Sequence, residues 1–215
     1  PMIIDFHTHA FGEKVANRAV SQLAQSVGGA IPETDGTIEG VRAHLRKHNA
    51  DYAVLASIAT NPHQMRAVTD FAKSVEGDGV IPFGSIHPDA PDAIDELLRI
   101  RDLGLKGIKL HPDYQQFYVD DPRMFPIYEA CVKLGLIVLF HAGMDMGLPL
   151  PIHCTPERLK KIIPCFEGGT IVAAHYGGYA MWDGVLKHLC GKEIYFDTSF
   201  AAWRIPVYMA RALYD

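Results

Sequence analysis

Short apolar runs alternate with helical patterns along the whole chain. Each run is nearly continuous in aliphatic residues, which is typical of parallel strands buried on both faces. Strands are expected at 1–9, 52–57, 80–88, 105–111, 136–141, 170–175 and 194–199. Helices are expected at 13–26, 37–49, 61–75, 89–103, 121–134, 156–163, 180–190 and 205–214. A strand–helix order repeated seven times predicts a parallel α/β sheet.

Two folds bury both faces of such a sheet: an open doubly wound sheet and a closed TIM-type (β/α)8 barrel. A doubly wound sheet holds its chemistry at one switch point, whereas a barrel collects side chains from the C-terminal ends of many strands. Polar side chains end six of the expected strands: His7 and His9, His87, Lys109 and His111, His141, His175, and Asp197. No Gly-x-Gly-x-x-Gly turn follows the first strand. The pattern therefore favours the barrel.

The length of 215 residues suits a single domain over 1–215. A barrel uses roughly 31 residues per βα unit, so this length holds about seven units. The eighth strand of a complete barrel is therefore missing from this sequence. Seven strands alone would leave two unpaired sheet edges, which natural sheets avoid. We expect the chain to be truncated at its C-terminus, and a strand swapped in from a partner is the alternative.

Composition narrows the class of protein further. The net charge of −5 gives no basic surface for nucleic acid, and no apolar run reaches the roughly 20 residues of a membrane span. The four cysteines form no Cys-x-x-Cys pair and are expected to be reduced thiols. With no signal peptide visible, a cytoplasmic protein is expected. The aromatic tail, with Trp203, Tyr208 and Tyr214, indicates a homodimer face.

The first strand ends in Asp-x-His-x-His, formed by Asp5, His7 and His9. Side chains alternate along a strand, so these three are expected on one face. Two neutral imidazoles there can bind one divalent first-row metal ion, and Asp5 is expected to orient one of them.

Four motifs together resemble the amidohydrolase superfamily, and specifically its amidohydrolase-related branch that includes aminocarboxymuconate-semialdehyde decarboxylase. They are Asp-Phe-His-Thr-His at 5–9, Phe-His-Ala-Gly at 140–143, Ala-His-Tyr-Gly-Gly at 174–178 and Tyr-Phe-Asp-Thr-Ser at 195–199. The resemblance covers nearly the whole chain and implies a (β/α)8 barrel with a catalytic divalent metal. Zinc is expected, with manganese, iron or magnesium as alternatives.

The resemblance also implies residue roles. His7, His9 and His141 would bind the metal, and His175 would be a general base or acid or a ligand to a second metal. The family's strand-eight aspartate ligand has no counterpart before residue 215, and Asp197 belongs to the strand-seven motif. Without that aspartate the metal site is expected to be weak.

Lys109 has two interpretations. In two-metal relatives a lysine in a similar Gly-x-Lys-x-His motif is carboxylated by carbon dioxide and bridges two metals, which here would be held by His7 with His9 and by His141 with His175. Alternatively, Lys109 is a buried cation that binds a substrate carboxylate or pairs with Asp197, because an unpaired lysine inside a barrel is costly.

Residues at the strand ends and in the loops that follow them are expected to contact a small-molecule substrate. The candidates are His87, His111 and Tyr114, with Tyr118, His153, Trp182, Arg204, Met144 and Met146 as weaker ones. The histidines of the predicted helices are expected to be solvated: His44, His48, His63 and His188.

Three functions follow from this pattern. The first is a metal-dependent hydrolase of a small amide, lactone or ester, in which His175 handles the proton. The second keeps the same site and performs non-oxidative decarboxylation. Fold-level analogy alone does not choose between these two reactions. The third function is a non-catalytic barrel that binds a ligand or metal without turnover, and the missing eighth strand supports it.

Overall fold

The computed structural model describes residues 2–29 and 31–214. Its strands are β1 (Ile4–Thr8), β2 (Tyr52–Ala56), β3 (Val80–Phe83), β4 (Gly107–Leu110), β5 (Ile137–Phe140), β6 (Ile171–Ala173) and β7 (Tyr195–Phe196). Its α-helices are α1 (Glu13–Ser26), α2 (Ile38–His48), α3 (Met65–Ser74), α4 (Ala93–Asp102), α5 (Pro112–Gln115), α6 (Phe125–Leu134), α7 (Pro156–Ile162), α8 (Trp182–His188) and α9 (Val207–Tyr214). Short 3-10 helices are η1 (Pro62–Gln64), η2 (Pro122–Met124) and η3 (Ile163–Phe166).

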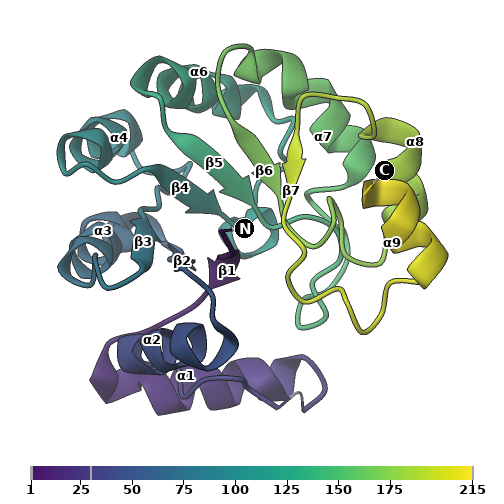
Figure 1. Cartoon of the computed structure of the whole chain (residues 1–215). Helices are drawn as coiled ribbons and strands as arrows, with labels where there is room; N and C mark the ends of the chain where they lie inside the picture. The colour runs from purple at the N-terminus through teal and green to yellow at the C-terminus, as the bar shows by residue number, and fades with distance from the viewer. Residues whose placement is uncertain (1, 30, 215) are drawn as a thin grey trace.

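The strands pair in parallel and in chain order, first β1-β2-β3 and then β4-β5-β6-β7. Backbone bonds at Gly84 join the two groups, because its N–H donates to the Gly107 carbonyl (3.0 Å) and its carbonyl accepts from the Lys109 N–H (2.9 Å). A Cβ at Gly84 would lie 2.6 Å from the Ile100 side chain, so only glycine fits at this junction. The strands surround a common centre with helices outside them (Figure 1).

Two apolar layers account for the nearly continuous hydrophobicity of the strands. The inner layer is a cluster of buried side chains from facing strands: Val54, Ala56, Phe83, Leu139, Val172 and Ala174. The outer layer packs the opposite strand faces, including Ile108, Val138 and Ile171, against the helices. Lys109, Leu139 and Val172 lie side by side in register, so the Lys109 side chain points inward with the inner layer. This is the predicted TIM-type arrangement with seven βα units.

Several element boundaries differ from the prediction. The strand predicted over 80–88 ends at Phe83, and the helix predicted from Asp89 begins at Ala93. The short helix α5 was predicted as loop, but Pro112 at its first turn and the His111 side chain, which accepts from the Tyr114 N–H, start a helix there.

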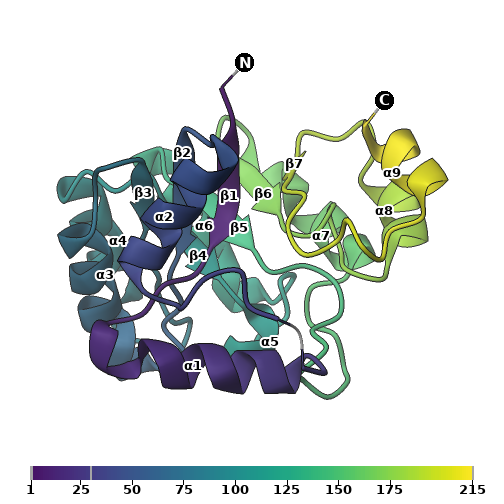
Figure 2. The same cartoon turned by 60° about the horizontal axis from the view of Figure 1, so that its bottom comes forward.

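The chain that leaves β1 runs to α1, which lies beside α2 at the periphery of the barrel (Figure 1). Figure 2 shows α1 along the lower edge of the molecule, where the chain leaves β1. The predicted loop over 144–155 reaches this helix, because a Cβ at Gly147 would lie 3.0 Å from the Ser26 side chain.

The C-terminal segment leaves aromatic side chains on the surface. Trp203 is 58% exposed, Tyr208 is 71% exposed and Tyr214 is 88% exposed. The predicted homodimer face, the single domain over 1–215 and the truncation remain predictions. Among residues 2–29 and 31–214, every helix is too short or too polar to cross a bilayer.

Candidate metal centre

The end of β1 brings two histidines to the centre of the barrel but turns Asp5 away. The rings of His7 and His9 are 5.1 Å apart between centroids. The β1–β2 register shifts between Asp5 and Thr8, and Thr8 Oγ1 donates to the Val54 carbonyl (2.8 Å). The Asp5 carboxylate accepts from the His7 backbone N–H (3.3 Å) and lies 4.0 Å from Nε2 of His44 on α2. The regular alternation that predicted Asp5 beside a ligand ring is therefore broken.

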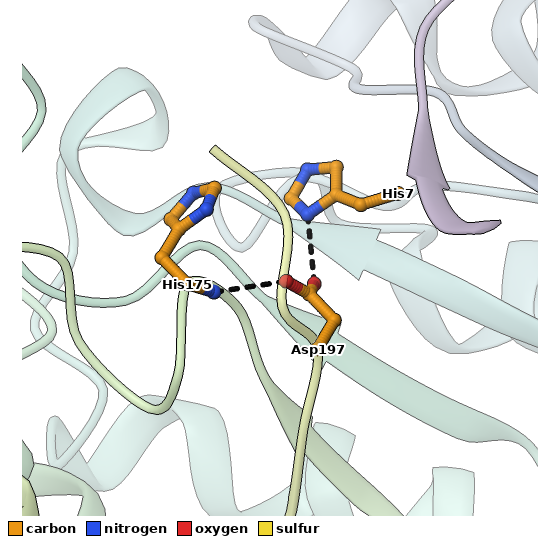
Figure 3. A group of neighbouring side chains, drawn as sticks. All are labelled: His7, His175 and Asp197. Atoms are coloured by element: carbon orange, nitrogen blue, oxygen red, sulfur yellow. Dashed lines mark hydrogen bonds and ion pairs between the residues drawn. The ribbon is translucent and has the colours of Figure 1, made fainter. Parts of the chain in front are cut away.

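Asp197, just after β7, orients His7 in place of Asp5 (Figure 3). His7 Nδ1 lies 2.8 Å from Asp197 Oδ2, and both side chains are at least 95% buried. The other oxygen, Oδ1, accepts from the backbone N–H groups of His175 (2.9 Å) and Ser199 (3.0 Å) and from Ser199 Oγ (2.6 Å). Burial alone would raise the pKa of Asp197, but the charge of His7 and these hydrogen bonds lower it below its usual range.

His175 is held by an unusual turn directly after β6. The φ angles of His175, Tyr176 and Gly177 are all positive, at 62°, 54° and 82°. Side chains rarely adopt this conformation, so the surrounding bonds must maintain it. One of them is donated by Trp182 Nε1 to the His175 carbonyl (3.0 Å), which gives Trp182 a positioning contact instead of the predicted contact with substrate.

The partners of the rings define which nitrogen carries each proton. His175 Nδ1 faces the Ser199 carbonyl (2.9 Å), which only accepts, so this nitrogen is the donor and Nε2 holds a lone pair. Nε2 in turn lies 3.2 Å from His141 Nδ1, which must donate. The remaining nitrogen, His141 Nε2, is then a lone pair that is buried and has no partner among the described residues. The same reasoning gives His7 a donor Nδ1 and a lone pair on Nε2.

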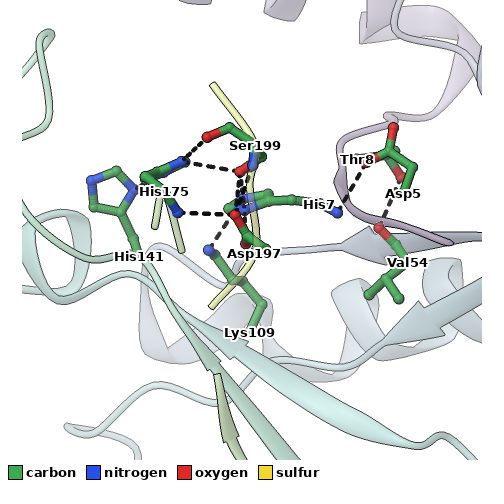
Figure 4. Close-up of polar contacts among 9 residues, drawn as sticks. All are labelled: Asp5, His7, Thr8, Val54, Lys109, His141, His175, Asp197 and Ser199. Carbon is green, nitrogen blue, oxygen red and sulfur yellow. Dashed lines mark hydrogen bonds and ion pairs between the residues drawn. The ribbon is translucent and has the colours of Figure 1, made fainter. Parts of the chain in front are cut away.

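Lys109 is fully buried, and its Nζ lies 3.2 Å from His7 Nε2 (Figure 4). The predicted ion pair with Asp197 is not among the ion pairs of the described residues. The Asp197 carboxylate is occupied by His7, and its charge acts on Lys109 only from farther away. Burial lowers the pKa of Lys109 from 10.5 to about 7, so the amine exchanges a proton near neutral pH.

A second group of donors lies beside the first. His111 stacks on His141 with ring centroids 4.0 Å apart, and its Nε2 lies 3.2 Å from Asp145 Oδ2. The same Asp145 oxygen lies 3.9 Å from His141 Nε2. Tyr114 packs its ring against His111 at 4.3 Å and donates its N–H to His111 Nδ1 (3.3 Å). The predicted substrate residues His111 and Tyr114 therefore adjoin the metal centre.

Other predicted residues lie outside this cluster of contacts. His87 is buried, and its Nδ1 accepts from the Asp89 N–H (3.2 Å). His153 holds the 144–155 loop, because its backbone N–H and Nδ1 both bond to Asp113 Oδ1, at 2.9 and 2.7 Å. Tyr118 packs between His153 and Arg158, and Arg204 lies over the Trp203 ring. Met146 accepts from the Tyr179 hydroxyl, and Met144 packs against the outer core.

The donor set fits a divalent transition metal. Two sets each offer ligand atoms within 4.8 Å of one another, His7 with His175 and Asp197, and His111 with His141 and Asp145. The predicted set of His7, His9 and His141 does not appear as one such group among the described residues. Burial lowers the pKa of His7 and of His141, which keeps both rings in the neutral form that binds metals. The unpartnered His141 Nε2 is the atom that a cation would satisfy.

Two residues of this centre were missed as site residues. Asp145 follows β5 in a loop, where the sequence shows a single aspartate between two methionines and no recognisable spacing. Ser199 lies in the quoted strand-seven motif, so its position was visible although its role was not.

Comparisons with known proteins bear on the family. One relative in sequence is 2-amino-3-carboxymuconate-6-semialdehyde decarboxylase of Dictyostelium discoideum, which is 37% identical over 135 residues. The match covers 55% of this chain and 36% of that protein's length, so the chain spans well under half of that relative.

Solved structures share the fold. An uncharacterized TIM-barrel protein from Bordetella bronchiseptica has a TM-score of 0.70 and 18% identity, with 98% of this chain and 80% of that chain covered. 5-carboxyvanillate decarboxylase from Novosphingobium aromaticivorans, complexed with manganese and 4-hydroxy-3-methoxy-5-nitrobenzoic acid, has a TM-score of 0.58 and 18% identity, with 82% and 65% covered. The family model described as amidohydrolase matches residues 4–215, and the chain therefore belongs to the amidohydrolase family.

Proposed function

We propose that the histidine centre supports metal-dependent, non-oxidative decarboxylation of a small conjugated carboxylic acid. The observation that carries this proposal is a fully buried lysine, Lys109, whose Nζ lies 3.2 Å from His7 Nε2 and has no carboxylate paired to it among the described residues. Two relatives named above are decarboxylases, one of them complexed with manganese, and this favours the decarboxylase over the hydrolase that the sequence first predicted.

The metal would be held by neutral imidazole nitrogens. His7 and His141 present Nε2 lone pairs, His9 lies beside His7, and the Asp145 carboxylate is the acidic group near His141 Nε2. When bound, a divalent ion anchors substrate oxygen atoms and lowers the pKa of a bound water. We propose Zn²⁺ or Mn²⁺ as this ion, because both bind imidazole and carboxylate ligands.

Lys109 and His175 would divide the proton chemistry between them. In the reaction the bond between the carboxylate carbon and its neighbour breaks, carbon dioxide leaves, and the electron pair stays on the neighbouring carbon. That carbon must take up a proton, and the Lys109 ammonium has three N–H groups to offer inside the barrel. The lone pair on His175 Nε2 accepts from His141 Nδ1, so His175 would take up a substrate hydroxyl proton once the substrate displaces that hydrogen bond.

The alternative to a single metal ion is a pair of ions with Lys109 carboxylated between them. Two donor sets are present, Lys109 Nζ lies 3.2 Å from His7 Nε2 of the first, and the neutral form of this amine could add carbon dioxide to form a carbamate. Metal analysis separates the two arrangements, because one ion at the centre removes the bridge and two ions support it.

The experiment is turnover on a panel of hydroxybenzoates, lactones and amides with added Zn²⁺ or Mn²⁺. Release of carbon dioxide from a carboxylated substrate, lost in Lys109→Met, supports the proposal. Hydrolysis of a lactone or amide without carbon dioxide release would establish the hydrolase instead. Binding of substrate without any turnover would leave only a ligand-binding barrel.

A further inference from the structure

A second group of metal-binding side chains lies outside the barrel, on the outer face of α2. His44 and His48 are one helical turn apart, and their ring centroids are separated by 4.4 Å. Glu33 reaches the same place from the segment that precedes α2. One ring nitrogen from each histidine and one carboxylate oxygen of Glu33 all lie within 4.8 Å of one another.

The spacing suits a chelate. Side chains at i and i+4 share one face of a helix, which is why paired histidines at this spacing bind zinc. In a tetrahedral zinc site the ligand atoms are about 3.4 Å apart, given metal–ligand distances of about 2.0–2.1 Å. Glu33 and His48 are exposed and can close the remaining gap by changing rotamer. His48 is also the last residue of α2, where the helix dipole favours a cation.

His44 supplies the second observation. Its side chain is 22% exposed, yet its Nδ1 is buried and has no hydrogen-bond partner among the described residues. Its other nitrogen, Nε2, lies 4.0 Å from Asp5 Oδ2. A metal-binding histidine commonly donates its free N–H to a carboxylate, which fixes the ring and strengthens the ligand. Asp5, which points away from the barrel centre, stands where that carboxylate belongs.

We propose that Glu33, His44 and His48 form an additional site for a divalent transition metal, with Zn²⁺ preferred, and that Asp5 orients His44 within it. We call these three ligands the α2 site. An ion there ties the segment before α2 to the helix, and through Asp5 it tightens the contact between α2 and β1. The α2 site is independent of the proposed reaction, because none of its ligands belongs to the barrel centre.

The test compares His44→Gln/His48→Gln with His63→Gln, which removes an exposed histidine from η1. Each untagged protein is stripped with chelator, dialysed against Zn²⁺, and its bound metal is measured by elemental analysis. We expect the double variant to bind one equivalent less than His63→Gln, and Co²⁺ titration to lose one tetrahedral absorption component. Equal metal content in the two proteins would overturn the proposal.

A second measurement separates the α2 site from the barrel centre. In His7→Gln/His141→Gln, the ion that remains should belong to the α2 site, and Zn²⁺ should still raise the unfolding temperature. Adding Glu33→Gln to His7→Gln/His141→Gln should weaken Zn²⁺ binding, because the α2 site then loses its carboxylate ligand. If Zn²⁺ leaves the unfolding temperature of His7→Gln/His141→Gln unchanged, the α2 site does not bind metal, whatever the fate of the proposed reaction.

Discussion

Lowering the pH should reduce the free energy of unfolding of the metal-free protein, because His175 is buried in its neutral form. Burial, reinforced by the charges of His7 and Lys109, lowers the pKa of His175 from 6.5 to about 3. The unfolded chain therefore takes up a proton at this residue near pH 6.5, while the folded protein does not take it up until the pH approaches 3. His175 does not reduce the free energy of unfolding well above pH 6.5, where it is neutral in both states. It reduces that free energy progressively as the pH falls from 6.5 toward 3.

The magnitude follows from these two pKa values. Between pH 7 and pH 5 the unfolded state gains about three quarters of a proton at His175, because its pKa is 6.5, and the folded state gains almost none. Integrating the linkage relation over this interval gives a loss of about 2 kcal/mol from this residue. That loss is a large fraction of the roughly 5–15 kcal/mol that stabilises a typical domain.

The assay is urea unfolding of chelator-treated protein at several values of pH between 7 and 5, followed by circular dichroism. His175→Gln should lose about 2 kcal/mol less over this interval than the wild type, because glutamine does not titrate. His63→Gln, which removes an exposed histidine, is the matched control and should follow the wild type. If wild type and His175→Gln lose stability in parallel, His175 is not held neutral by burial and the reasoning fails.

Four further changes test the centre and the barrel. Asp197→Asn should lower metal affinity about 10- to 100-fold, since the partner that orients His7 is weakened, and isothermal titration checks this. Lys109→Met should abolish carbon dioxide release while metal content stays at the wild-type level. Leu139→Ala, in the fully buried inner layer, should cost about 2–5 kcal/mol in urea unfolding. Tyr128→Phe removes the donor to the Val119 carbonyl (2.8 Å) and should cost about 1–3 kcal/mol by the same assay.

The fold was predictable because strands that are buried on both faces are continuous runs of apolar residues in the sequence. Strands such as β5 and β6 are apolar throughout, since Leu139 faces the inner layer and Val138 faces the helices. Helix starts were readable where a side chain caps them, as Thr37 does for α2 by accepting from the Gly40 N–H. Strand ends were less predictable. After Val80–Phe83, Gly84 forms an isolated bridge to Ile108, and Ile86 is buried outside the strand. Burial of apolar residues alone therefore does not mark where the strand ends.

The centre was predictable in its residue types but not in its partners. Strand alternation correctly brings His7 inward, but it assigns Asp5 to the same face because it assumes a regular register. The register shift before Thr8 breaks that assumption, and Asp197 from the other end of the sheet takes the position beside His7. His7 and Asp197 are 190 residues apart in the sequence, so no local spacing pattern predicts their contact. The same shift that turns Asp5 away from the barrel centre places its carboxylate beside His44, and one irregularity in β1 thus connects the metal centre to the proposed α2 site.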